Sequence, residues 1–145
     1  MKEKIAFVVQ RYGLEVNGGA ELHCRQLAEK LSSYYDVEVL TTCALDYVNW
    51  KNYYSQGVEV INNVTVRRFQ VDKERNINKF NKLSERVLNN PNGSYDENIE
   101  WMNSQGPICN GLLEYLDANE QVYKKIIFMT YLYFTTFWGL QKHAD

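Results

Sequence analysis

A glycine pair near the start of the chain has the residue types and the spacing to bind an anion. Gly18 and Gly19 follow the apolar run 5–9 and a polar loop, and they precede a segment with helical periodicity. A residue without a Cβ lets a ligand approach the backbone, and the first N–H groups of a helix have no partner inside it. The pattern therefore predicts a phosphate site at Gly18 and Gly19, with ordinary turn chemistry as the alternative. The glycine spacings of dinucleotide folds and of P-loops are not met.

Further candidate residues follow the predicted strands, because a parallel sheet binds its ligands at the carboxyl ends of its strands. Gln10, Arg11 and Tyr12 come directly after the first strand and are expected to face the cleft. Arg11 could pair with a carboxylate or phosphate of a ligand, or be a solvated loop cation. Asp46 could replace the ribose-binding carboxylate of dinucleotide folds, but it lies well inside a loop. The remaining predicted cleft residues are Asn17, Thr42, Thr130 and Tyr131.

No arrangement for acid–base catalysis stands out, and the catalytic residues are unassigned. His23 flanks the apolar stripe of the predicted helix, and His143 lies at the end of the sequence. Glu21 has a structural reason to be where it is, because a carboxylate in the first turn offsets the partial positive charge of a helix N-terminus. Tyr131 and Tyr133 could stack on a sugar ring or pack in the core, and the loop cluster Trp50, Tyr53 and Tyr54 is equally ambiguous.

Periodicity places these residues on an α/β fold. The runs 4–9 and 37–42 are apolar or β-branched almost throughout, as is typical of strands covered on both faces in a parallel sheet. Between them, residues 20–31 repeat their apolar side chains every three or four positions, which predicts a helix. Such a strand–helix–strand unit closes right-handed and places the glycine loop at the carboxyl edge of the sheet.

The middle of the chain predicts a hairpin and a helix. Residues 58–61 and 65–69 read as two short strands, and Asn62-Asn63 between them tolerate positive φ. A helix is expected over 74–88, in a charged stretch that would cap the sheet.

The last third predicts a helix, a buried strand and a second packed helix. Pro107 is expected in the first turn of a helix that ends near Asp117, and 125–130 reads as a buried strand. The uncharged run 126–140 is shorter than the roughly twenty residues that cross a bilayer, and peripheral membrane contact is the alternative to packing. We therefore expect one Rossmann-like domain with a mainly parallel sheet and helices on both faces.

Composition excludes several function classes. The chain has 145 residues, 45% of them hydrophobic, and a formal net charge of -2, so the basic surplus that nucleic-acid binding requires is missing. Cys24, Cys43 and Cys109 are widely spaced and predict neither a disulfide framework nor a metal site. The apolar run after the first four residues is too short for a signal-peptide core, which predicts a cytoplasmic protein.

The order of these motifs resembles the retaining glycosyltransferases of the GT-B type, family four. The resemblance rests on the strand Lys-Ile-Ala-Phe-Val-Val at 4–9, on Gly-Gly-Ala-Glu at 18–21, on Thr41-Thr42 and on the late strand at 126–128. It covers essentially the whole chain as the N-terminal, acceptor-side half of such an enzyme. It implies that Gly18 and Gly19 reach the diphosphate of a nucleotide-sugar donor, that a glycan or lipid-linked molecule is the acceptor, and that no metal or other cofactor takes part.

The chain departs from the family at two points. Family members often have a histidine after the late strand, where this chain has Thr130-Tyr131. Their donor-binding glutamates belong to a C-terminal domain that this chain does not contain, so the 145 residues alone are expected to be inactive. Two other functions are open: a free-standing nucleotide-binding domain of the oxidoreductase kind, and a non-catalytic interaction domain with an exposed aromatic patch at 131–138.

Overall fold

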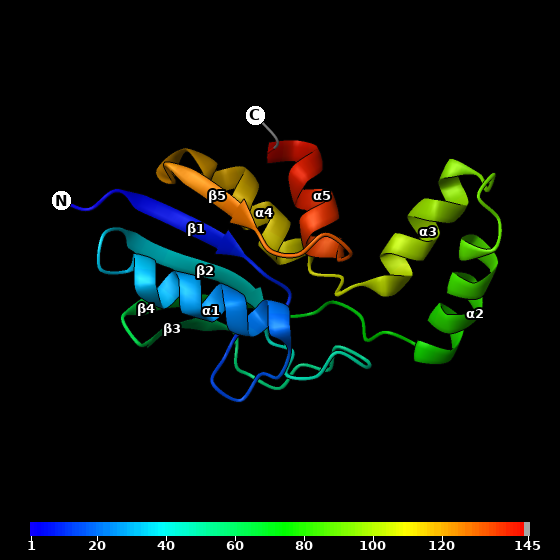
Figure 1. Ribbon diagram of the computed structural model, residues 1–145, viewed down its shortest axis with the longest axis horizontal. Helices are drawn as coiled ribbons and strands as arrows, with labels where there is room; N and C mark the ends of the chain where they lie inside the picture. The colour runs from blue at the N-terminus through cyan, green and yellow to red at the C-terminus, as the bar shows by residue number, and fades with distance from the viewer. Residues whose placement is uncertain (144–145) are drawn as a thin grey trace.

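The computed structural model describes residues 1–143 and contains a five-stranded sheet of order β3-β4-β2-β1-β5 (Figure 1). Strands β1, β2, β4 and β5 are mutually parallel where they pair, and β3 runs antiparallel to β4. The strands are β1 (Lys4–Val8), β2 (Asp36–Thr42), β3 (Gly57–Ile61), β4 (Val64–Phe69) and β5 (Lys125–Phe128). The expected α/β, mainly parallel, Rossmann-like domain is confirmed.

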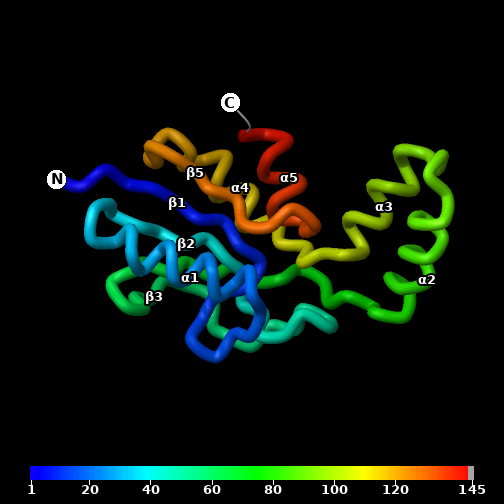
Figure 2. The backbone as a smooth tube through the Cα atoms, in the orientation of Figure 1, coloured from blue at the N-terminus to red at the C-terminus, as the bar shows by residue number. Residues whose placement is uncertain are grey.

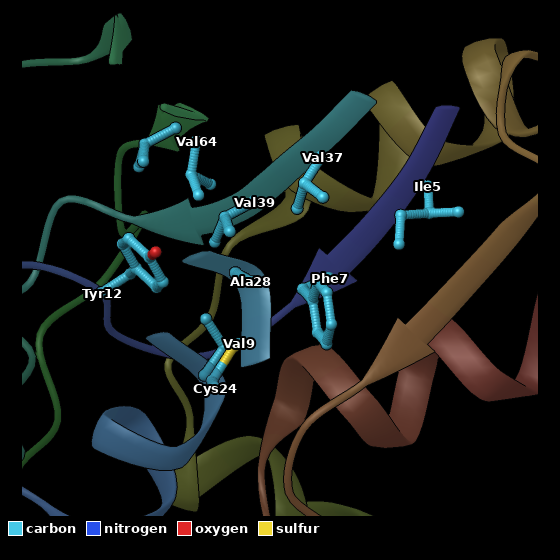
Figure 3. Packing of buried hydrophobic residues seen from close by; sticks show 10 residues of the cluster. Ile5, Phe7, Val9, Tyr12, Cys24, Ala28, Val37, Val39 and Val64 are labelled. Carbon is cyan, nitrogen blue, oxygen red and sulfur yellow. The ribbon is translucent and has the colours of Figure 1, made fainter. Parts of the chain in front are cut away.

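Helices cover both faces of the sheet, as the alternation along the strands requires. Ile5 and Phe7 of β1 point to one face and pack with α1 (Gly19–Leu31), while Ala6 and Val8 point to the other. That second face is covered by α4 (Asn110–Asn119) and α5 (Phe134–His143), and a short helix η1 (Glu120–Val122) leads from α4 to β5. Figure 3 shows the apolar side chains on the α1 face. The sheet is therefore the middle of three layers.

Two helices form a hairpin that projects from the rest of the fold. Helices α2 (Ile77–Leu88) and α3 (Tyr95–Gln105) pack on each other beyond the carboxyl ends of the strands (Figures 1 and 2). Side chains cap both helices, since Asn76 accepts from the Lys79 amide and Ser94 accepts from the Glu97 amide. The expectation that this stretch caps the sheet is wrong: the apolar faces of α2 and α3 are buried largely against each other.

Local turn chemistry is confirmed at one place and corrected at another. Asn62 and Asn63 join β3 to β4 with φ of 49° and 65°, as predicted for this hairpin. Pro107 does not lie in a first helical turn. The residue after it, Ile108, forms an isolated bridge with Lys73, and α4 begins only at Asn110. This extended pairing delays the helix.

Strand β5 is an edge strand. Ile126, Ile127 and Phe128 are half-buried, because β1 pairs with only one side of the strand and no strand among residues 1–143 pairs with the other. The expected buried strand followed by a packed helix is thus present, but the strand is only partly covered.

A buried carboxylate ties the amino end of the sheet together. Glu38 of β2 has no exposed surface and accepts hydrogen bonds from Arg67 Nε at 2.7 Å and from the Tyr123 hydroxyl at 2.8 Å. Lys4 Nζ lies 2.8 Å from Glu38 Oε2, the oxygen that also accepts from Tyr123. Burial acts to raise the pKa of Glu38, but these bonds outweigh it and hold the pKa below its ordinary value. The carboxylate is therefore charged and links β1, β2 and β4.

Candidate functional site

The glycine pair lies at the carboxyl edge of the sheet, where α1 begins. Gly18 is the residue before the helix and has φ of +134°, a conformation that other residues rarely adopt. The helix has no side-chain cap at this end. At Gly19 a Cβ would meet no atom within 4 Å, so the backbone faces open space. Gly18 and Gly19 are both exposed, and no side chain caps the first turn of the helix, so an anion site at this helix start stays a prediction.

Glu21 organises the loop that carries the glycine pair. Its Oε1 accepts hydrogen bonds from Gln10 Nε2 at 2.9 Å and from Arg11 Nε and Nη2 at 3.0 and 2.7 Å. A Cβ on Gly18 would lie 2.2 Å from Glu21 Oε2. Gly18 is therefore required by the packing of Glu21 as well as by its φ. Sequence reasoning gave Glu21 only the helix-terminus role and missed this one.

Arg11 is buried, so its guanidinium does not face the cleft, contrary to the prediction from the sequence. Besides Glu21, its guanidinium donates to the Leu45 carbonyl at 2.9 Å and to the Asn17 carbonyl at 2.7 Å. It is 5% exposed. The carboxylate of Glu21 neutralises the arginine from within the fold, and this pairing explains why its charge is turned inward.

Three other residues expected in the cleft are also buried. Gln10 is bonded to Glu21, and Thr42 Oγ1 donates to the Gln10 carbonyl at 2.7 Å. Tyr12 packs among the core residues under α1 (Figure 3), and burial raises the pKa of its hydroxyl. The chain turns inward after β1, which buries Gln10 and Tyr12, while Thr42 is buried at the end of β2 and bonds to the Gln10 carbonyl.

Asn17, Thr130 and Tyr131 stay at the surface of this edge. Tyr131 is 80% exposed, and Asn17 is exposed beside the glycine pair. Thr130 is half-buried and donates through Oγ1 to Gln10 Oε1 at 3.4 Å. Thr130 is thus linked to Glu21 through Gln10, so the end of β5 and the start of α1 belong to one surface.

Tyr54 and Arg68 support the loop that precedes the glycine pair. The Tyr54 hydroxyl donates to Glu15 Oε2 at 2.6 Å, and the Arg68 guanidinium lies 3.8 Å from the centre of the Tyr54 ring. A Cβ on Gly13 would come within 2.6 Å of the Tyr54 hydroxyl. Tyr54 is therefore a structural residue, while Tyr53 beside it is 64% exposed.

Two arginines hold the loop of residues 45–50, which follows β2. Arg11 binds the Leu45 carbonyl from one side, and its guanidinium lies 5.4 Å from the Tyr47 ring centre. From the other side Arg75 donates to the carbonyls of Tyr47 and Val48. The Asp46 carboxylate accepts from two amides of its own turn, at Val48 and Asn49. Asp46 therefore shapes the loop, and the structure gives no support to a ribose-binding role for it.

A pocket of about 390 Å³ lies between this loop and the projecting hairpin. Its volume falls within the range of small-molecule sites. The sequence did not reveal it, because its walls come from segments whose mutual placement no local pattern encodes. The lining residues are Trp50, Lys73, Glu74, Arg75, Asn76, Lys79, Phe80, Asp96, Ile99, Glu100, Asn103, Ser104, Gly106 and Ile108.

The titratable residues singled out from the sequence lie elsewhere or are inert. His23 is exposed on α1, and His143 is bonded to Asp117 and Glu120 at the amino edge of the sheet. All three cysteines are buried, and burial raises the pKa of Cys24 and Cys109 to about 12, which keeps these thiols protonated. Within residues 1–143 no group of three potential metal ligands comes together.

The aromatic segment 131–138 is mostly packed. Phe134 is 5% exposed, and the Trp138 indole donates to Asn103 Oδ1 at 2.9 Å. Of the aromatic patch that an interaction domain would need, only Tyr131 is strongly exposed in this segment, beside the aliphatic Leu132. None of the helices in the described part of the chain has the length and apolar character to span a membrane.

Comparison of the chain with protein-family models, with curated proteins and with solved structures gave no match.

Proposed function

We propose that this chain is the acceptor-side domain of a retaining glycosyltransferase of GT-B architecture, working in the cytoplasm. It would act with a donor-binding domain outside the chain and move a sugar from a nucleotide-sugar donor to a glycan or lipid-linked acceptor. The observation that carries the proposal is the uncapped start of α1, where Gly19 opens to free space at the carboxyl edge of a Rossmann-like sheet.

The chemistry proposed for this edge is electrostatic. As the sugar leaves its donor, negative charge grows on the diphosphate, and preorganised N–H dipoles at a helix start stabilise such charge. Arg11 and Glu21 neutralise each other, so the stabilisation comes from main-chain amides of Gly19 and Ala20. The buried ion pair acts as a positioning element that fixes these amides.

Titration of the ¹⁵N-labelled chain with pyrophosphate, UDP and GDP, followed by amide NMR, tests the phosphate site. We expect saturable shifts at Gly19 and Ala20, with weak affinity because the chain supplies only a few donors. Gly19→Val should reduce the shifts, since a branched side chain fills the open space there. Gly111→Ala is the matched control, because a Cβ at Gly111 meets only ordinary contact at 3.7 Å from Phe69. Shifts that avoid the start of α1 would contradict the proposal.

The chain by itself should transfer no sugar, because the donor-binding half is outside it. Mass spectrometry of glycan and lipid-linked acceptors incubated with nucleotide sugars would detect transfer. Transfer by residues 1–145 alone would refute the two-domain proposal. Saturable binding of NAD without binding of UDP or GDP would favour the nucleotide-binding alternative of the oxidoreductase kind.

A further inference from the structure

The pocket beside the projecting hairpin is lined by polar groups with no protein partner. The side chains of Lys79, Asp96 and Glu100 make no hydrogen bond or ion pair with any residue that the structure describes. Asn103 uses Oδ1 to accept from Trp138, and its Nδ2 has no partner within residues 1–143. Donors and acceptors of both kinds are therefore available around one cavity.

The charges that line the pocket balance. Its positive side chains are Lys73, Arg75 and Lys79, and its negative ones are Glu74, Asp96 and Glu100. Arg75 is also engaged with the 45–50 loop, which leaves the free charges of the pocket without a positive excess. Lys73 and Lys79 then face the three carboxylates of Glu74, Asp96 and Glu100, so a phosphate or nucleotide gains no net attraction, and a ligand without net charge fits better.

Apolar groups form the rest of the wall. Phe80 lies stacked on Trp101 with 11° between the ring planes, and Ile99 and Ile108 join it in lining the pocket. Trp50 is fixed there by its indole, which donates to the Gln105 carbonyl at 2.7 Å. Such a wall favours a ligand that has apolar C–H faces between its polar groups.

We propose that this pocket binds a neutral saccharide. Hydroxyl groups of a sugar can donate to the carboxylates of Asp96 and Glu100 and accept from Lys79 and the Asn103 amide, while a ring face lies against the apolar wall. The inference that this saccharide is the acceptor rests on the proposed transferase function. The binding itself depends only on the pocket.

Amide NMR of the full chain with four neutral trisaccharides, of maltose, cellulose, mannan and chitin type, tests the proposal. We expect at least one to give saturable shifts at Ile99, Glu100 and the Trp50 indole. Glu100→Gln should weaken binding about tenfold, since it removes a charge-assisted acceptor. Glu114→Gln is the control, because Glu114 is exposed on α4 and outside the pocket. Ser104→Trp should abolish binding by filling the cavity.

Several results would overturn the inference. These are no saturable shift with any of the four saccharides, shifts confined to other surfaces, or binding that survives Ser104→Trp in a folded variant. Tighter binding of trigalacturonate or UDP in this pocket would also overturn it. The Trp50 indole signal and the circular dichroism spectrum report whether each variant is folded. Saccharide shifts here without nucleotide shifts at Gly19 would remove the transferase proposal and leave this one standing, and the reverse result would do the opposite.

Discussion

The Glu21 carboxylate holds the glycine loop in place through its hydrogen bonds to Gln10 and Arg11. Both partners of the Arg11–Glu21 ion pair are almost fully buried, and Gln10 donates to the same carboxylate. Glu21→Gln should destabilise the fold by about 3–5 kcal/mol, because it leaves the Arg11 charge buried and uncompensated. Urea denaturation measures the loss, with Glu114→Gln as an exposed control. A loss as small as that of the control would show that the Arg11 guanidinium becomes hydrated when the residue at position 21 carries no charge.

The two glycines should respond differently to the same methyl group. Gly18→Ala should cost about 1–3 kcal/mol or more, because alanine resists φ of +134° and its Cβ would collide with Glu21. Gly19→Ala should change stability by less than about 1 kcal/mol, since its Cβ enters open space at a helical position. Thermal unfolding of both variants checks the contrast. Equal losses would mean that the loop rearranges around Gly18.

At the residue scale the sequence predicted backbone roles better than side-chain roles. The glycine pair and the Asn62-Asn63 turn follow from local conformational preference: Gly18 has positive φ directly before α1, and Asn62-Asn63 form the predicted turn. Arg11 and Tyr12 were expected to face outward because they follow a strand. Their actual burial depends on where the loop turns and on the Glu21 carboxylate ten residues further along the chain. Such a pairing across a loop has no local signature.

At the scale of elements, the buried carboxylate of β2 makes stability depend on pH. Burial would raise the pKa of Glu38, but bonds from Lys4, Tyr123 and Arg67 lower it below 4.5. The unfolded chain therefore binds a proton here more readily than the folded chain does, so this contribution is complete above pH 4.5 and is lost as the pH falls through the lowered pKa. Glu38→Gln should cost about 2 kcal/mol at neutral pH and flatten the acid limb of the stability curve. Urea titrations across acidic pH measure both effects.

The 45–50 loop should become more mobile when Arg75 is replaced by lysine, which lacks the several donor nitrogens of the guanidinium. Arg75 donates to two carbonyls of the loop and to Gln105 Oε1 at 2.5 Å, which a lysine cannot do from one nitrogen in the same geometry. Arg75→Lys should therefore increase amide hydrogen exchange at residues 47–50. The control is Arg25→Lys, which alters a surface pair within α1. Unchanged exchange in the Arg75 variant would mean that Arg11 and the Asp46 turn suffice to hold the loop.

Periodicity predicted the strands, the first helix and the hairpin because each has a strong local pattern. It could not predict that α2 and α3 leave the sheet, since a helix with one apolar face packs equally well on a sheet or on another helix. Nor could it place Pro107 outside α4, because the bridge between Ile108 and Lys73 joins residues far apart in the sequence. The pocket depends on both features and was missed for the same reason.

On the scale of the whole molecule, the candidate chemistry lies at one end. The glycine pair, the 45–50 loop and the pocket all lie at the carboxyl ends of the strands, whereas Glu38 and His143 lie toward the amino ends. The carboxyl ends of its parallel strands are the edge at which such a sheet binds ligands. The amino edge can thus be altered for stability without direct contact with either candidate site.

The projecting hairpin gives the molecule a second, smaller unit. It connects to the sheet through the segments on either side of it and through contacts such as Trp50 with Gln105. The free energy needed to open such a unit locally is smaller than the free energy needed to unfold the core. A molecule held between the hairpin and the main body would oppose that opening. A ligand bound in the pocket would therefore slow amide hydrogen exchange along both α2 and α3.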